Sequence, residues 1–318
     1  MHKLTMIKND MITFSEGCDK YIDYCKQRNL RQATINHYKQ SYKQFYKFFG
    51  SDMPLCKMTQ QAYSDYVIYL CDTLTNDVSI NSYLRDLITT VHFLQSEGYV
   101  QHFKMKAIKV SKEPIETYTE DELKCLLKKP NLKQCKFIEY QCWVMTNFLF
   151  STGVRQHSLM NIKIKDIDFD NFVVYINVTK NRKPLIIPLN QTMINILKEF
   201  LKFRQYKNID DYLFCNVYGQ QLVKSTCYHQ LYDYNKRRGI QTTGIHRYRH
   251  TFAKQWILNG GNVVTLQKIL GHSSLAITQN YINLLVSDVV KEVNEINLLD
   301  KFSNISNHRI KMNNKSQK

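Results

Sequence analysis

The stretch FVVYINVTKNRKPLIIPL, residues 172–189, sets the fold class that the sequence predicts. Two apolar segments, FVVYINVT and PLIIPL, are rich in β-branched residues and flank a short polar segment from Lys180 to Lys183. This pattern is typical of two antiparallel strands joined by a hairpin turn. It is the main strand signal in the chain, so we predict one small antiparallel sheet whose hairpin has a basic tip.

The sequence on both sides of this hairpin predicts helices. MINILKEFLKF, HRYRHTFAKQWIL and LAITQNYINLL follow it with helical spacing of their apolar residues. About four similar segments precede residue 100 and predict a compact helical bundle. One of them, residues 31–50, has an apolar stripe opposite Lys39, Lys43 and Lys47, which form either a DNA-contacting face or a solvated one. The predicted fold is mainly α with a small antiparallel sheet.

A polar segment divides the chain into two predicted domains. Residues 112–117 are mixed in charge and contain a proline, and the Thr119 and Glu122 that follow have the spacing of a capping box. We predict a helical domain over residues 1–111, a linker over 112–117 and an α+β domain over 118–295. Residues 296–318, rich in Asn, Lys and Ser, are expected to form a flexible tail.

The charge of the chain favours a polyanionic partner. It has 44 Lys and Arg against 27 Asp and Glu, a net charge of +17, and the excess is spread over both domains and the tail. Such a distribution suits an extended nucleic acid held from more than one side. A basic protein with no nucleic-acid role is the alternative reading.

Cysteine usage and hydropathy indicate the compartment. The nine cysteines form no Cys-x-x-Cys pair, which predicts neither a zinc site nor a disulfide framework and favours reduced thiols. The first ten residues lack the apolar core of a signal peptide, and no apolar run approaches the length of a membrane span. We expect a cytoplasmic protein that is not bound to a membrane.

Residues of the second domain could together carry out chemistry on a phosphodiester. Two arginines can each donate paired hydrogen bonds to one phosphate. Histidine and lysine can transfer protons, and a tyrosine can attack phosphorus if a base accepts its proton. A tyrosine nine residues after a histidine completes this set of candidates: Arg155, Lys180, His246, Arg249, His272 and Tyr281.

Four motifs of this domain resemble the signature boxes of the tyrosine recombinases, also called the phage integrase family. They are TGVR, VTKNRKPLIIPL, HRYRHTFA and LGHSSLAITQNYINL, and their order and local spacing match the family from about residue 118 to 290. The N-terminal bundle is similar to the SAM-like core-binding domain of that family. The resemblance therefore implies a helical DNA-binding domain followed by an α+β catalytic domain.

This resemblance also implies a role for each candidate residue. Arg155 and Arg249 would hold the non-bridging oxygens of the scissile phosphate, and His272 would hydrogen-bond to the same phosphate. In the reaction itself, Lys180 would protonate the departing 5′ oxygen, His246 would help to accept the tyrosine proton, and the nucleophile Tyr281 would form a 3′-phosphotyrosyl link. No metal, ATP or other cofactor is implied.

The implied activity is site-specific recombination of duplex DNA. Family members exchange strands through a Holliday junction, as a homo-tetramer on two sites with short inverted repeats, and we expect a monomer free in solution. Residues 287–300 resemble the C-terminal helix that docks into a neighbouring protomer. A bacterial, phage or mobile-element origin fits this activity. A type IB topoisomerase and a catalytically silent DNA-binding relative remain as alternatives, and the choice among integration, inversion and dimer resolution stays open.

Several positions leave alternatives open or depart from the family. Lys183 and Arg182 compete with Lys180 at the hairpin tip, and Lys180 is preferred because of its alignment with the family. His246 and His250 have a spacing that zinc sites use, but no third ligand is evident, and His250 is interpreted as a structural residue. Two further residues replace common family types: Ser158 stands where an acid is usual, and Tyr248 where an aliphatic residue is common.

Overall fold

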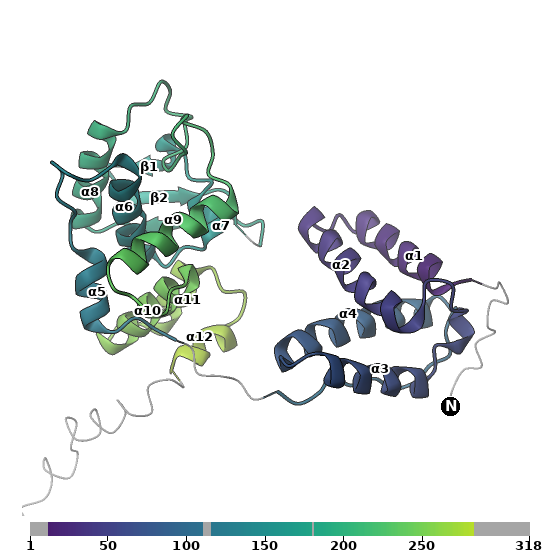
Figure 1. Ribbon diagram of the computed structural model, residues 1–318. Helices are drawn as coiled ribbons and strands as arrows, with labels where there is room; N and C mark the ends of the chain where they lie inside the picture. The colour runs from purple at the N-terminus through teal and green to yellow at the C-terminus, as the bar shows by residue number, and fades with distance from the viewer. Residues whose placement is uncertain (1–11, 111–115, 180, 283–318) are drawn as a thin grey trace, which may run out of the picture. The chain divides into compact units, whose positions relative to one another are not determined.

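The computed structural model describes residues 12–110, 116–179 and 181–282, and it forms two compact units, Met1–Glu113 and Pro114–Lys318 (Figure 1). Within these residues the chain is mainly α, with a single three-stranded antiparallel sheet in the order β1-β2-β3. The predicted fold class is thereby confirmed. No helix in the described part of the chain is long and apolar enough to cross a membrane.

The first unit is a bundle of helices around an aromatic core. Its elements are α1 (Phe14–Gln27), α2 (Gln32–Phe49), the short 3-10 helix η1 (Leu55–Lys57), α3 (Gln60–Thr73) and α4 (Asp77–Ser96). On α2 the predicted apolar stripe faces the core, where Phe45 packs edge-on against Tyr66 at 5.7 Å between ring centroids. Lys39, Lys43 and Lys47 lie exposed on the opposite face of α2. The sequence pattern therefore predicted the orientation of this helix correctly.

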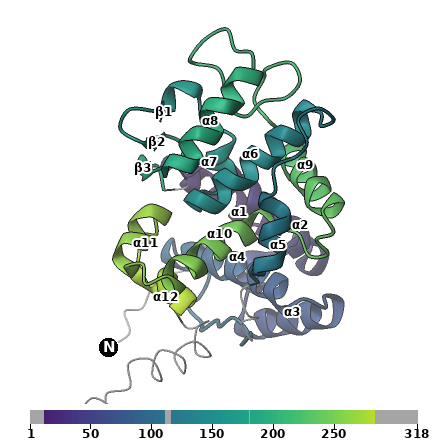
Figure 2. The same ribbon diagram turned by 90° about the vertical axis from the view of Figure 1, so that its left-hand side faces the viewer.

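The second unit is built around one largely buried helix. Its elements are α5 (Glu120–Leu127), α6 (Phe137–Thr152), α7 (Gln156–Leu159), η2 (Ile164–Asp166), β1 (Ile167–Asp168), β2 (Val173–Ile176), β3 (Leu185–Pro188), α8 (Gln191–Phe203), α9 (Lys224–Arg237), α10 (Ile245–Leu258), α11 (Val263–Leu270) and α12 (Leu275–Ile282). Helix α6 packs against α5, α8, α9 and α10 (Figures 1 and 2). A helix with apolar residues on most sides is stable only when other elements bury those residues. The surrounding helices therefore pack on α6.

The predicted hairpin is present as β2 and β3. They pair in antiparallel register, with Val174 opposite Ile187 and both side chains buried. The intervening Ile186 is exposed, as the period of two in a strand requires. The two-residue strand β1 adds to the β2 edge. Because β3 also contacts α11, the sheet lies beside the C-terminal helices (Figure 2).

The start of the second unit is fastened to α10. The capping box of α5 is confirmed, since the Glu122 amide donates to Thr119 Oγ1 and the Thr119 amide donates to Glu122 Oε2. Immediately before it, the Tyr118 amide donates to Thr251 Oγ1 at 2.9 Å, and the Arg247 guanidinium lies 4.6 Å from the centre of the Tyr118 ring. The end of the predicted linker is therefore tied to the helix that carries the HRYRH motif.

Gly153 lets three helices meet closely at the end of α6. It has a left-handed φ of +62°, and a Cβ atom there would lie 2.6 Å from a carbon of Phe252 and 2.7 Å from a carbon of Leu270. Any side chain would therefore push α10 and α11 away from α6. The backbone requirement and the close approach both call for glycine.

We expect Gly153→Ala to destabilise the second unit by roughly 2–4 kcal/mol, because a left-handed alanine and an overpacked core each cost about 1–3 kcal/mol. Urea unfolding followed by tryptophan fluorescence measures this unit alone, since both tryptophans, Trp143 and Trp256, belong to it. Gly239→Ala is the matched control, with φ +80° and nothing within 4 Å of the added Cβ. Equal losses in the two variants would show that the packing argument is wrong.

Candidate active site

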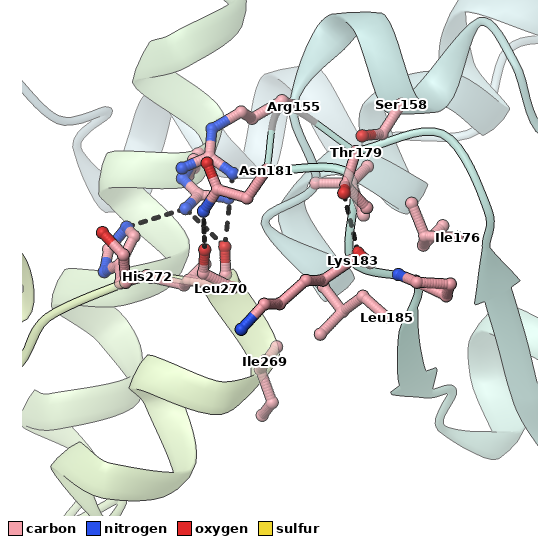
Figure 3. Close-up of a pocket in the computed structure, with 15 residues that line it drawn as sticks. Arg155, Ser158, Ile176, Thr179, Asn181, Lys183, Leu185, Ile269, Leu270 and His272 are labelled. Carbon is pink, nitrogen blue, oxygen red and sulfur yellow. Dashed lines mark hydrogen bonds between the residues drawn. The ribbon is translucent and has the colours of Figure 1, made fainter. Parts of the chain in front are cut away.

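Three of the predicted residues line one pocket in the second unit. Arg155 follows α6, Arg249 lies on α10, and His272 follows α11, so the residues come together only because these helices converge (Figure 3). The pocket has a volume of about 420 Å³, and its opposite wall is the hairpin, which contributes Thr179 and Lys183. The pocket therefore combines the arginine, hairpin and histidine motifs of the sequence.

Arg249 is buried and held by backbone oxygens. Its Nη1 donates to the Gly153 carbonyl and its Nη2 to the Leu270 carbonyl, both at 2.8 Å, and only 4% of the residue is exposed. Burial, together with the nearby charge of Arg155, lowers the pKa of Arg249 to about 10. The group remains a cation at neutral pH. Carbonyl oxygens fix its orientation and leave its positive charge uncompensated.

Arg155 shares one of those acceptors. Its Nη1 lies 3.5 Å from the Leu270 carbonyl oxygen, and partial burial lowers its pKa. Among the described residues, neither this guanidinium nor that of Arg249 forms an ion pair with a carboxylate. Two neighbouring cations withdrawn from water are unfavourable unless an anion joins them. The pair is therefore a site for an anion such as a phosphate.

The neutral Ser158 contributes to the positive charge of the pocket, because it stands where a negatively charged residue is usual. Where the family usually has an acid, its Oγ donates to the Val178 carbonyl at 2.9 Å and so connects α7 to the strand that leads into the hairpin. The serine braces the wall of the pocket by a neutral hydrogen bond. An acid in its place would add a negative charge beside Arg155, and the pocket is more positive without it.

The ring of His272 connects Arg249 to α12. Its Nε2 lies 2.7 Å from Arg249 Nη2, and its Nδ1 lies 2.9 Å from Thr278 Oγ1. Because a guanidinium only donates, Nε2 accepts and the ring proton lies on Nδ1. Burial and the charges of Arg249 and Arg155 lower the pKa of His272 to about 4. The ring is therefore neutral at physiological pH.

Tyr281 lies on α12 with its phenol turned into the protein. Only 4% of the residue is exposed, and its ring stacks on that of His272 with an interplanar angle of 6°. Burial raises the pKa of the phenol, and the charges of Arg249 and Arg155 act against this rise. Its oxygen accepts a hydrogen bond from the Arg249 side chain and also lies 2.9 Å from His250 Nδ1. From the sequence, His250 is interpreted as a structural residue, with a zinc ligand as the alternative.

The remaining candidates are His246, which is not among the described residues that line the pocket, and Lys180. His246 is exposed on the first turn of α10, and its ring centroid lies 6.4 Å from that of His250. Lys180 lies outside the described residues. Its neighbours Thr179 and Asn181 line the pocket, and so does the competing Lys183, whose carbonyl accepts a hydrogen bond from Thr179 Oγ1. Tyr248 is fully buried and donates to Asn235 Oδ1, which accounts for a tyrosine at this position.

A zinc site at His246 and His250 would need further ligands. Within the described ranges no group of three or more His, Cys, Asp or Glu side chains is arranged to hold a metal ion. His250 Nδ1 is instead occupied by the phenol of Tyr281. The interpretation of His250 as a purely structural residue is also incomplete, because its partner is the predicted nucleophile.

Comparison with known proteins identifies the same domains. The model of the "Phage integrase family" matches residues 116–287, and that of the "Phage integrase SAM-like domain" matches residues 13–110. The tyrosine recombinase XerC of Leptospira interrogans is 27% identical over 289 residues, covering 88% of this chain and 92% of that protein. XerD of Listeria monocytogenes is 26% identical over 281 residues, covering 84% and 94%. The Tn1549 transposon integrase in complex with transposon right end DNA shares the fold, with a TM-score of 0.72 at 17% identity, covering 89% of this chain and all of that one.

Two histidines withdrawn from solvent, the half-buried His250 and the buried His272, predict how stability depends on pH. Burial lowers the pKa of both His250 and His272 from 6.5 to about 4. Between these values the unfolded chain binds protons that the folded protein excludes, so the free energy of unfolding falls as the pH is lowered through this window. We expect this fall in urea titrations at pH 6.5 and 5, and His272→Gln should remove roughly half of it.

The matched control for this measurement is His229→Gln, a change of an exposed ring on α9 that leaves both buried rings in place. It should keep the full dependence on pH. A dependence that survives in the double variant His250→Asn, His272→Gln would have to arise elsewhere in the protein.

Proposed function

The chain belongs to the phage integrase family, the tyrosine recombinases, and from this we propose that Tyr281 cuts duplex DNA at specific sites and that the same pocket rejoins it. The protein is a site-specific DNA recombinase, and DNA is its partner. The observation that carries the proposal for the site is the buried phenol of Tyr281 beside two arginines that no described carboxylate neutralises.

The scissile phosphate would bind between Arg155 and Arg249. Each guanidinium has five N–H donors, and the backbone carbonyls of Gly153 and Leu270 occupy only part of them. The remaining donors can hold the two non-bridging oxygens and stabilise the charge that grows on them in the transition state. His272 would add a third contact if its ring proton moves from Nδ1 to Nε2, so that Nε2 donates to the phosphate in place of accepting from Arg249, while Thr278 Oγ1 donates to Nδ1.

Cleavage would exchange one ester for another. The phenol oxygen of Tyr281 forms a bond to phosphorus, the bond from phosphorus to the 5′ oxygen breaks, and a 3′-phosphotyrosyl link results. The reverse attack by a 5′ hydroxyl restores the DNA. The bond energy is kept in the protein–DNA link, so the exchange needs no ATP.

We assign the proton for the leaving oxygen to Lys180, in keeping with its alignment. Support comes from its neighbours, since Thr179 and Asn181 both line the pocket. His246 completes the proposed set of six residues from its exposed position three residues before Arg249, where bound DNA can reach it. The exposed Lys39, Lys43 and Lys47 on α2 would contact the DNA backbone from the first unit.

The assembly is part of the same proposal. Four protomers would bind two sites with short inverted repeats and exchange strands in turn through a Holliday junction. The segment at residues 287–300, which resembles the helix that docks into a neighbouring protomer, lies outside the described residues. The matching family model and the relatives XerC and XerD favour a recombinase over a topoisomerase, and an assay for the covalent adduct distinguishes an active enzyme from a silent relative.

Replacing the nucleophile tests the core of the proposal. We expect Tyr281→Phe to bind DNA as tightly as the wild type and to form no covalent adduct, because only the phenol oxygen is lost. The probe is a pool of nicked duplex oligonucleotides with a randomised core. Wild-type adducts are recovered from a denaturing gel and sequenced, and the selected duplex then serves for binding and cleavage assays. An adduct formed by Tyr281→Phe would mean that another residue attacks.

Replacing the general acid tests the assignment of Lys180. We expect Lys180→Ala to slow cleavage of the selected duplex by ~10²–10⁴-fold, the usual contribution of a general acid. A bridging 5′ sulfur at the scissile position is a leaving group that needs little protonation, so it should remove most of this defect. Arg155→Ala should remain slow on both substrates, since it acts on the non-bridging oxygens.

Lys183→Ala is the matched control, because Lys183 shares the hairpin and the charge and lines the pocket. Rescue of Lys183→Ala by sulfur, with Lys180→Ala still slow, would transfer the role of general acid to Lys183.

A further inference from the structure

The phenol of Tyr281 has a defined partner that the assigned set of six does not include. Tyr281 Oη lies 2.9 Å from His250 Nδ1, and their ring centroids are 5.6 Å apart. The contact joins α10 to α12, two helices that pack against each other. It therefore belongs to the packing that places the nucleophile beside the arginines.

The direction of this hydrogen bond follows from the other groups around it. Burial raises the pKa of the phenol, so its proton is present, and a buried hydroxyl proton requires an acceptor. Arg155 and Arg249 can only donate. Burial, followed by the charges of His246 and Arg249, lowers the pKa of His250 to about 4, so its ring is neutral and one of its nitrogens can accept. The Tyr281 hydroxyl thus donates to His250 Nδ1.

We propose that His250 is a further catalytic residue of this protein, which accepts the phenolic proton of Tyr281 during strand cleavage and returns it during rejoining. This inference rests on the proposed function of Tyr281 as the nucleophile. It gives His250 the role that sequence analysis expected of His246, which lies on the exposed first turn of the same helix. The geometry favours His250 because it already contacts the reacting oxygen.

The proton and the bonds balance in each direction. As Tyr281 Oη bonds to phosphorus, its proton moves to His250 Nδ1, while the 5′ oxygen leaves with a proton from the general acid. In rejoining, the 5′ hydroxyl returns its proton to the general acid as its oxygen attacks phosphorus, and Tyr281 leaves with the proton held by His250. The phenol becomes a much stronger acid as its bond to phosphorus forms, so a weakly basic imidazole suffices.

Phosphate binding would prepare His250 for this role. Its pKa is lowered in part by the charge of Arg249, and an anion bound to Arg249 offsets that charge. The imidazole therefore becomes a better base when the substrate is in place. Without DNA the same ring stays neutral and keeps the phenol protonated, so the nucleophile is not activated in the free protein.

The test distinguishes a His250 that accepts the proton of Tyr281 from one that only positions the Tyr281 side chain. His250→Asn keeps an oxygen that accepts a hydrogen bond near the Nδ1 position and cannot take up a proton. We expect it to slow single-turnover adduct formation on the selected duplex by ~10²-fold or more. Installing 3,5-difluorotyrosine at position 281 makes the phenol a stronger acid, and the defect of His250→Asn should then shrink to about tenfold or less. The defect of Arg249→Ala should be the same with either phenol.

Measurements on the free protein guard against misfolding. The ¹⁹F resonance of difluorotyrosine 281 should shift in His250→Ala and return toward the wild-type position in His250→Asn, because asparagine restores an acceptor. An unchanged resonance in His250→Ala would show that the contact does not exist and would overturn the inference. Tryptophan fluorescence verifies that the second unit is folded in each variant.

Each kinetic result supports or removes the inference. A rate for His250→Asn within about threefold of the wild type, or a defect that fluorination leaves unchanged, would exclude His250 as the proton acceptor. Rescue of His246→Asn by fluorination, with His250→Asn insensitive to it, would assign the proton to His246. A wild-type protein that forms no adduct with any duplex would instead refute the proposed function, and the role of His250 with it.

Discussion

The Leu270 carbonyl oxygen accepts hydrogen bonds from both Arg249 and Arg155, and this shared acceptor keeps two positive charges together at the floor of the pocket. Leu270 is the last residue of α11, so its carbonyl belongs to the helix end that carries partial negative charge and has no partner within the helix. A helix terminus here replaces a carboxylate. It orients the guanidinium groups and leaves their net charge available to an anion. The glycine at the end of α6 and the packing of α10 on α11 both serve to bring this oxygen within reach.

Local patterns allowed much of the fold to be predicted. The β2–β3 hairpin, the capping box before α5 and the buried stripe of α2 follow from residues near one another in sequence, where periodicity and side-chain type decide the structure. The strand β1 has only two residues and gives no periodic signal. The convergence of Arg155, Arg249 and His272 was predicted through family motifs; the spacing along the chain alone does not bring their helices together.

The contact between His250 and Tyr281 could not be predicted from local sequence. Helical periodicity places His246 and His250 on one face of α10 and does not say which of them meets a residue on α12. That choice depends on how α12 packs over α10, a long-range property of the fold. The backbone acceptors of Arg249 were hidden for the same reason, since carbonyl oxygens have no signature in a sequence. Histidine side chains that are buried and neutral destabilise the protein in acid, a cost that commonly accompanies sites shaped for function.

Helix α12 carries both Tyr281, the proposed nucleophile, and Thr278, which contacts His272, a proposed ligand of the phosphate. Thr278 and Tyr281 lie about one turn apart, and the first holds Nδ1 of His272 while the second supplies the phenol. A displacement of this short helix therefore removes both at once. With the proposed roles, losing the position of α12 would cost the site its attacking group and the support of His272 together. Such coupling would protect the DNA, because a pocket without α12 would lack both the attacking group and the full set of contacts to the phosphate.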